Sequence, residues 1–396
     1  MSEWQTFCLK DLGKIVGGAT PSTNNPKNYG NKITWITPKD LSTLQGRYIE
    51  KGSRSISRLG FKSCSTFLLP KHAILFSSRA PIGYVAIAKK RLCTNQGFKS
   101  IIPNKKIYFE FLYYLLKYHK DNISNIGGGT TFKEVSGATL GLFKVKIPPT
   151  YYEQQKIART LSILDQKIEN NHKINELLHK ILELLYEQYF VRFDFLDENN
   201  KPYQTSGGKM KFSKELNRLI PSGWSVRFLN HKIVSTYQPK TISKTLLNDS
   251  YSYSVYGGGG IIGRFTEYNH EQSEFIISCR GQCGISYLTL PKSWITGNAM
   301  VIKPTKSYTS KTYLYHTIKK YKLTNYITGS VQPQITRQNL STMPILIPKR
   351  KTLNKWNNIS SLLWNLIHNN MQSTQTLTVL RDFLLPLLLK QQVKPQ

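Results

Sequence analysis

Acidic residues are scarce in this sequence. Its 396 residues include 55 Lys and Arg but only 22 Asp and Glu, which gives a formal net charge of +33 at pH 7. A charge of this size predicts a polyanionic partner such as a nucleic acid.

Long apolar runs are also missing. The apolar run at 383–389 is interrupted by Pro386 and falls well short of the ~20 residues that a membrane span needs. The N-terminus lacks a basic segment followed by an apolar stretch, so no secretory signal is predicted. We expect no membrane association and a cytoplasmic, nucleoid-associated protein.

The common signatures of enzymes are absent as well. The five cysteines show no C-x-x-C spacing, which disfavours a disulfide framework and a zinc site. No phosphate-binding loop of the form G-x-x-x-x-G-K-S/T occurs. The G-x-G-x-x-G pattern at Gly258, Gly260 and Gly263 is followed by a polar segment, so a tight turn is predicted there rather than a dinucleotide site. We find no catalytic constellation and expect no cofactor on this chain.

The two halves of the chain repeat each other at an offset of about 200 residues. Arg79 recurs as Arg280, and Pro103 recurs as Pro304, both at an offset of 201. Each copy reads as a globular block followed by a helical block. The chain is also long enough for two domains of ordinary size. Residues that differ between the copies are therefore where the two domains differ in function.

Five segments follow from this repeat. They are a first globular domain at 1–150, a long helix at 151–192, a linker at 193–217, a second globular domain at 218–348, and a second long helix with a tail at 349–396. The first domain has 23 Lys and Arg against 7 Asp and Glu, the second has 15 against 4, and the first helix has 6 against 6. The basic surface therefore belongs to the globular domains.

Apolar runs and turn residues predict a mixed fold of the α/β (α+β) class for both domains. Strands are expected at 33–36, 73–76 and 275–277, and helices at 109–118 and near 311–321.

The helical blocks show a heptad pattern. From Ile157 to Tyr189 the seam positions step by four and three, and Asn171 and Asn175 lie near the centre. The second block has matching seam positions at Leu363, Asn370, Leu377 and Leu384. We predict that the two helices pair as an antiparallel coiled coil whose facing positions sum to 541. Asn171 should then face Asn370, Leu164 should face Leu377, and Leu178 should face Leu363.

Several segments together resemble the specificity (S) subunits of type I restriction-modification enzymes. The similar segments are 17–22, 33–41, 127–136 and 147–157 in the first half, and 253–262, 280–284, 298–299 and 329–335 in the second. One departure concerns the second helix, which lacks the family's Pro-Leu-x-Glu-Gln start and has Pro348-Lys349-Arg350 instead. We expect this helix to start late or to dock its partner less tightly.

The resemblance implies a non-catalytic subunit. Each globular block would be a target recognition domain that reads half of a split duplex DNA sequence. The paired helices would fix the half-site spacing and hold two methyltransferase (M) subunits. Restriction/translocase (R) subunits would complete the complex, and S-adenosylmethionine, ATP and Mg²⁺ would bind to these partner subunits.

Candidate DNA-binding residues come from basic turns and from loops that differ between the halves. They are Arg79, Lys99, Thr131, Lys133, Tyr256, Arg264, Arg280, Gln332 and Gln334. An arginine can contact guanine or phosphate, but matching arginines in domains that read different sequences fit a structural or phosphate-binding role equally well. The loops at 130–133 and 331–334 could read bases or dock onto the helices.

Two alternatives stay open. A self-contained DNA-modifying enzyme would transfer methyl groups as a purified chain, whereas the specificity subunit would not. An RNA-binding scaffold could use the 23 tyrosines for base stacking, and competition between duplex DNA and RNA would separate it from the DNA-binding hypothesis.

Overall fold

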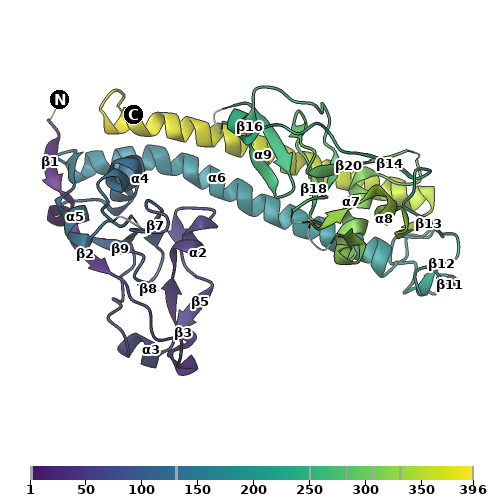
Figure 1. Cartoon of the computed structure of the whole chain (residues 1–396), viewed down its shortest axis with the longest axis horizontal. Helices are drawn as coiled ribbons and strands as arrows, with labels where there is room; N and C mark the ends of the chain where they lie inside the picture. Colours follow the sequence, from purple (N-terminus) through teal and green to yellow (C-terminus); the bar gives the residue numbers. More distant parts are fainter. Residues whose placement is uncertain are drawn as a thin grey trace. The chain divides into compact units, whose positions relative to one another are not determined.

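The computed structural model describes residues 3–129, 133–248, 251–281, 283–305, 307–329 and 332–394. The chain forms two compact units. Unit 1 comprises Met1–Lys173 and Asn370–Gln396, and unit 2 comprises Ile174–Asn369. Each unit therefore contains one globular domain and one part of each long helix (Figure 1).

Unit 1 is built on a mixed sheet with strand order β2-β9-β6-β7-β4, accompanied by a second sheet, β5-β3-β8. The strands of the first sheet are β2 (Gly13–Gly17), β4 (Tyr48–Ile49), β6 (Ile74–Phe76), β7 (Val85–Ala88) and β9 (Lys99–Pro103). Those of the second are β3 (Tyr29–Ile36), β5 (Arg54–Ile56) and β8 (Cys93–Thr94). The helices of the domain are α1 (Leu9–Leu12), α2 (Pro38–Ser42), α3 (Arg58–Lys62), α4 (Phe109–Asn125) and α5 (Gly137–Leu142).

The central strand β6 is apolar throughout because both of its faces are covered. Ile74 and Phe76 belong to the core that α4 helps to form, whereas Leu75 belongs to a separate apolar cluster. Successive side chains of a strand point to opposite faces. The sheet of unit 1 therefore separates two small cores.

Unit 2 repeats this arrangement. Its four-stranded sheet has the order β14-β20-β17-β18, and its three-stranded sheet has the order β16-β15-β19. Their strands are β14 (Val234–Tyr237), β15 (Tyr253–Gly257), β16 (Gly260–Phe265), β17 (Phe275–Ser278), β18 (Ser286–Leu288), β19 (Trp294–Ile295) and β20 (Ala299–Pro304). The parallel pair β3 with β8 recurs as β15 with β19. The predicted mixed fold and its repetition are confirmed.

The same strand pairing closes each domain before its long helix. In unit 1, β1 (Gln5–Cys8) pairs with β10 (Lys144–Ile147), and in unit 2, β13 (Ser225–Phe228) pairs with β23 (Pro344–Ile347). Unit 2 also contains α7 (Lys311–Lys320), α8 (Arg337–Ser341), β11 (Met210–Ser213), β12 (Arg218–Pro221), β21 (Ile327–Thr328) and β22 (Gln334–Ile335). Glycine-rich Gly258-Gly259 is the turn of the β15–β16 hairpin, as the sequence predicts.

The long helices are α6 (Tyr151–Tyr186) and α9 (Arg350–Leu389). Their first residues are 199 positions apart, so the expectation of a late start for the second helix is wrong. Leu353 and Trp356 are both buried in the first two turns of α9. Tertiary packing thus fixes the start of a helix whose first turn has no acidic residue.

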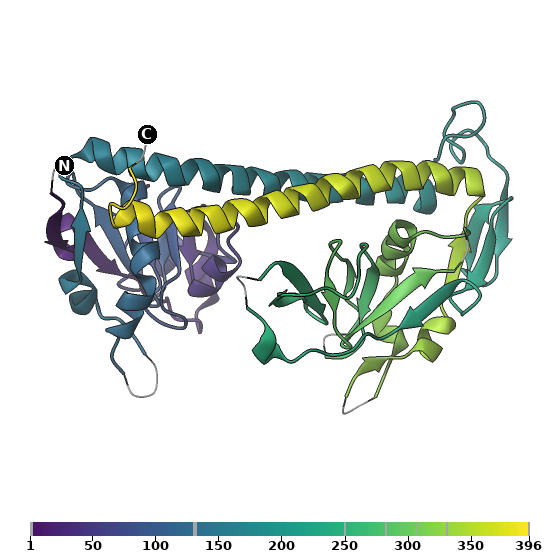
Figure 2. The same ribbon diagram turned by 90° about the horizontal axis from the view of Figure 1, so that it is seen from above.

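The two long helices run antiparallel, as predicted. In unit 1, the Asn171 amide donates to the Thr374 hydroxyl at 3.2 Å, and Asp165 pairs with Arg381. In unit 2, the Asn175 amide donates to the carbonyl of Ile367 at 3.3 Å. Higher numbers on α6 meet lower numbers on α9 in both units, and the two ribbons lie side by side in both views (Figures 1 and 2).

Candidate nucleic-acid interface and helix junctions

An arginine turn and a hairpin base lie together in unit 1. Val135 donates its backbone N–H to the carbonyl of Ser78, which places the base of the hairpin beside Arg79. Gly128 and Glu134 close that base by a pair of backbone hydrogen bonds of 3.0 and 2.8 Å.

The Glu134 carboxylate forms ion pairs with two of the candidate DNA-binding residues. Its carboxylate is 3.2 Å from Lys99 Nζ and 3.6 Å from an Arg79 guanidinium nitrogen. The side chains of Arg79 and Glu134 are 38% and 35% exposed, so the group is accessible to a ligand. Lys133, the preceding residue, is exposed, and Thr131 lies outside the described residues. The structure therefore brings Arg79 and Lys99 together around an acidic residue that the sequence analysis did not single out, and it places Lys133 next to that residue in the chain.

Unit 2 contains the same arrangement with different side chains. Ile335 donates its backbone N–H to the carbonyl of Cys279, and Arg280 forms a β-bridge with Gln334. The β21–β22 pairing closes the hairpin. The side chains of Arg280, Gln332 and Gln334 are all exposed.

A glycine turn follows the arginine in both copies and explains part of the repeated sequence. Gly83 and Gly284 have φ values of +104° and +89°, which L side chains rarely adopt. Each donates its backbone N–H to a backbone carbonyl at the end of the preceding strand. The acceptor is the carbonyl of Ser77 in unit 1 and that of Ser278 in unit 2. The shared turn fixes the backbone conformation next to the arginine in both units. It does not determine what the arginine side chain contacts.

The two other candidates occupy different surroundings. Tyr256 is only 3% exposed, and its hydroxyl accepts a hydrogen bond from the backbone of Leu290. Burial raises the pKa of Tyr256 to about 12. Arg264 is half-buried and donates to the carbonyls of Tyr251 and Ser252. The structure thus places Tyr256 in the core and uses Arg264 to hold a loop, and neither joins the hairpin.

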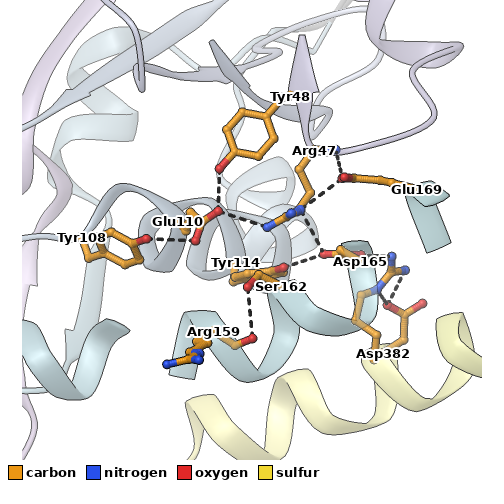
Figure 3. Close-up of polar contacts among 11 residues, drawn as sticks. Arg47, Tyr48, Tyr108, Glu110, Tyr114, Arg159, Ser162, Asp165, Glu169 and Asp382 are labelled. Atoms are coloured by element: carbon orange, nitrogen blue, oxygen red, sulfur yellow. Dashed lines mark hydrogen bonds and ion pairs between the residues drawn. The ribbon is translucent and has the colours of Figure 1, made fainter. Parts of the chain in front are cut away.

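A buried ionic cluster joins the first domain to both long helices (Figure 3). The Arg47 side chain, 4% exposed, lies 3.1 Å from Glu110 of α4 and 3.2 Å from Glu169 of α6. Burial alone would lower the pKa of Arg47, but Tyr114 and the neighbouring carboxylates raise it above its usual value.

Asp165 extends this cluster to α9. One of its oxygens accepts from the Tyr114 hydroxyl at 2.6 Å, and the other is 2.8 Å from Arg381. Burial, followed by the charge of Asp165, raises the pKa of Tyr114. The first domain is therefore tied to both helices by charged groups. Sequence analysis missed this cluster.

Unit 2 uses aromatic packing at the corresponding junction. Residues related to Asp165 and Arg381 by the offset of 199 are Trp364 and Leu182, and both are buried. Trp364 packs edge-on against Tyr315, with ring centroids 5.4 Å apart. The rings of this aromatic cluster come from α6, the π-helical turn Glu187–Val191 that follows it, α7 and α9, and include Tyr186, Phe190, Tyr313, His316, Trp356 and His368. The two junctions share their geometry and differ in chemistry.

Among the described residues, no group of three or more His, Cys, Asp or Glu side chains is arranged to hold a metal ion. Within the same residues, no helix is long and apolar enough to cross a membrane.

Comparisons with known proteins agree on one family. The family described as type I restriction modification DNA specificity domain matches residues 1–180 and 221–378. The type I restriction enzyme MjaIX specificity subunit of Methanocaldococcus jannaschii is 32% identical over 421 residues, which cover 97% of this chain and 92% of the relative. The type I restriction enzyme HindI specificity subunit of Haemophilus influenzae is 31% identical over 191 residues, covering 46% of this chain and 40% of the relative.

A solved structure shares the fold. The crystal structure of the type I restriction-modification system S subunit from M. genitalium matches with a TM-score of 0.61 and 17% sequence identity. The match covers 98% of this chain and 96% of that chain.

Proposed function

Because the chain belongs to the family of type I restriction-modification specificity subunits, we propose that each globular domain reads one half of a bipartite duplex DNA target. The protein is a non-catalytic DNA-recognition subunit that works with methyltransferase and restriction subunits. The observation that carries the proposal is the repeated pair of an arginine turn and an adjoining hairpin, present once in each unit. Basic groups on such a surface bind phosphates, while neighbouring side chains can contact base edges.

Two equivalent apolar surfaces on the long helices support the docking of two methyltransferase subunits. Unit 1 exposes an apolar triad, and unit 2 exposes a second triad whose members are each related to it by an offset of 199. The unit 1 triad is Ile163, Leu380 and Phe383, and the unit 2 triad is Leu362, Ile181 and Leu184. Apolar side chains at matching exposed positions in both copies would suit one interaction surface that occurs twice. Two copies of one partner would fit two copies of one surface.

The remaining roles follow from this assignment. S-adenosylmethionine would bind the methyltransferase subunits, and ATP and Mg²⁺ would serve the restriction/translocase subunits. The paired helices would set the spacing between the two DNA half-sites, because a helix lengthens by 1.5 Å per residue. The complex would work in the cytoplasm, on the DNA of the nucleoid.

Domain exchange tests the two-reader proposal. Residues 1–145 are replaced by the corresponding region of a relative, and methylated motifs are mapped in cells that express the full complex. One half of the bipartite motif should change while the other half stays intact, since each domain has its own core. A continuous motif, or a change in both halves, would contradict the proposal.

A second measurement separates this function from its alternatives. The purified chain is tested alone and with methyltransferase subunits for methyl transfer to duplex DNA, and duplex DNA competes with RNA for binding. Methyl transfer should require the partner, and DNA should displace RNA. Methyl transfer by the chain alone would indicate an enzyme, and a preference for RNA would indicate a scaffold.

A further inference from the structure

The closing residue of each hairpin occupies the same structural position but differs in chemistry. Glu134 pairs with Gly128 in unit 1, and Gln334 pairs with Thr328 in unit 2. The two residues are 200 positions apart, in keeping with the repeat. Each lies beside the arginine of its own unit, through an ion pair with Arg79 or a β-bridge with Arg280. A shared scaffold thus presents a carboxylate in one domain and an amide in the other.

The carboxylate of Glu134 is unexpected on a surface that binds a polyanion. The first domain has a net charge of +16, and an exposed acidic group at its interface would repel phosphates. Such a group becomes useful if it accepts a hydrogen bond from a base, because cytosine N4 and adenine N6 are donors in the major groove.

The ion pairs of Glu134 give its carboxylate a defined orientation. One oxygen contacts Lys99 and the other contacts Arg79. Each carboxylate oxygen can accept more than one hydrogen bond, and the side chain is 35% exposed. Lone pairs therefore stay available to a ligand while the two cations hold the group in place.

Gln334 offers the amide counterpart. Its exposed side chain can both donate and accept, which matches the N6 and N7 edge of adenine. Arg280 next to it is exposed and forms no ion pair with a described residue.

We propose that positions 134 and 334 are matched specificity-determining positions, at which Glu134 accepts from the exocyclic amine of a base in one half-site and Gln334 contacts adenine in the other. Arg79 and Arg280 then bind the neighbouring backbone phosphates. The inference rests on the proposed function, since it needs two domains that each read a half-site.

The test exchanges the two side chains in the full complex. Glu134→Gln and Gln334→Glu are each introduced, and methylated motifs are mapped in cells together with the affinity of the purified complex for variant duplexes. Glu134→Gln should reduce discrimination at one base position of one half-site by roughly 5- to 150-fold, and leave the other half-site unchanged. Gln334→Glu should reduce discrimination at one base position of the other half-site and leave the first half-site unchanged.

A matched control separates base contact from charge. Glu50 is an exposed carboxylate of the same unit, 2.7 Å from Lys89, and Glu50→Gln removes the same charge. Uniform changes in affinity for all sequences, equal in Glu134→Gln and Glu50→Gln, would overturn the inference. Unchanged motifs in both exchange variants would also overturn it while leaving the two-reader function intact. A wild-type complex without a bipartite motif would overturn both.

Discussion

The side-chain amide of Asn171 on α6 donates to the backbone carbonyl of Asn370 on α9, at 3.5 Å. This contact lies within unit 1 and confirms that Asn171 meets Asn370, as the predicted register requires. The amide also donates to the hydroxyl of Thr374 at 3.2 Å. The pairs Leu164 with Leu377 and Leu178 with Leu363 remain predictions of the same register, and all four side chains are half-buried.

Leucine at both asparagine positions should strengthen the helix pair and weaken its register. A polar residue in a coiled-coil seam costs stability but specifies alignment. The variant Asn171→Leu with Asn370→Leu should unfold at a higher temperature, and disulfide trapping of cysteine pairs along the seam should detect shifted registers. A lower unfolding temperature with a single trapped register would contradict this role.

Breaking the buried ion pair between Asp165 and Arg381 should destabilise unit 1 strongly. Without Asp165, buried Arg381 keeps only the exposed Asp382 as an ion partner and the Tyr114 hydroxyl loses its acceptor. Breaking a buried pair typically costs about 3–5 kcal/mol. Asp165→Ala should therefore lower the free energy of unfolding by about 3 kcal/mol, measured by hydrogen exchange of the α4 amides. The double variant with both residues replaced by Leu should lose less than the sum of the two single variants, since unit 2 accommodates Trp364 and Leu182 at the equivalent positions.

The control for this measurement is the exposed pair Lys89 and Glu50 of the same unit. Lys89→Ala should leave α4 exchange unchanged because exposed pairs contribute little. Equal effects at the two pairs would show that the buried cluster has no special role.

Sequence patterns predicted the features that depend on local periodicity. The heptad seam predicted the antiparallel pairing of α6 and α9, and the offset between Arg79 and Arg280 predicted two domains with matching turns. Both depend on spacing along the chain, which is visible without coordinates.

The buried clusters depend on contacts far apart in sequence. Arg47 meets Glu110 and Glu169 at separations of 63 and 122 residues, and no pattern links them. Tyr256 was a candidate DNA-binding residue, yet its strand lies at the centre of the β16-β15-β19 sheet and buries it. Glu134 was overlooked because a single acidic residue in a basic domain forms no motif.

Unit 2 should lose stability as the pH falls below about 6.5. Burial lowers the pKa of His316 to about 3 and that of His368 to about 4, with nearby Lys319 and Lys311 adding to the effect on His316 and His368, respectively. The unfolded chain therefore binds protons between pH 6.5 and 4 that the folded unit does not bind. The contribution of the two neutral histidines to the free energy of unfolding has its full value above pH 7. It declines toward pH 4, by up to about 1.4 kcal/mol per pH unit for each histidine.

Apolar replacement should reduce this pH dependence, to which His179 and His270 of the same unit also contribute because burial lowers the pKa of both. His316→Phe with His368→Leu should flatten the slope of unfolding free energy between pH 6.5 and 4.5, measured by urea unfolding of the full chain. His231→Gln, at an exposed position of the same unit, is the control and should leave the slope unchanged. An unaltered slope in the double variant would show that these histidines are not its source.

Charged residues in one apolar triad should remove one methyltransferase subunit. Ile181→Glu with Leu184→Glu alters the unit 2 triad, and Leu380→Glu with Phe383→Glu alters the unit 1 triad. Because these side chains are exposed, the fold should persist. Native mass spectrometry of the co-purified complex should then show one bound methyltransferase subunit instead of two, whereas Lys180→Glu should keep both. Full occupancy in both triad variants would place the docking surface elsewhere.

Lengthening both long helices together should change the accepted spacing between DNA half-sites. Duplicating residues 170–176 and 365–371 adds one heptad to each helix, and the facing ends of these segments sum to 541, so the seam is preserved. At 1.5 Å per residue each helix grows by about 10 Å, the rise of about three base pairs. Motif mapping in cells should show the same two half-sites with a longer spacing, while the same duplication in α6 alone should disrupt the helix pair and abolish the motif. Unchanged spacing in a complex that still contains its methyltransferase subunits would show that the helices are not the ruler.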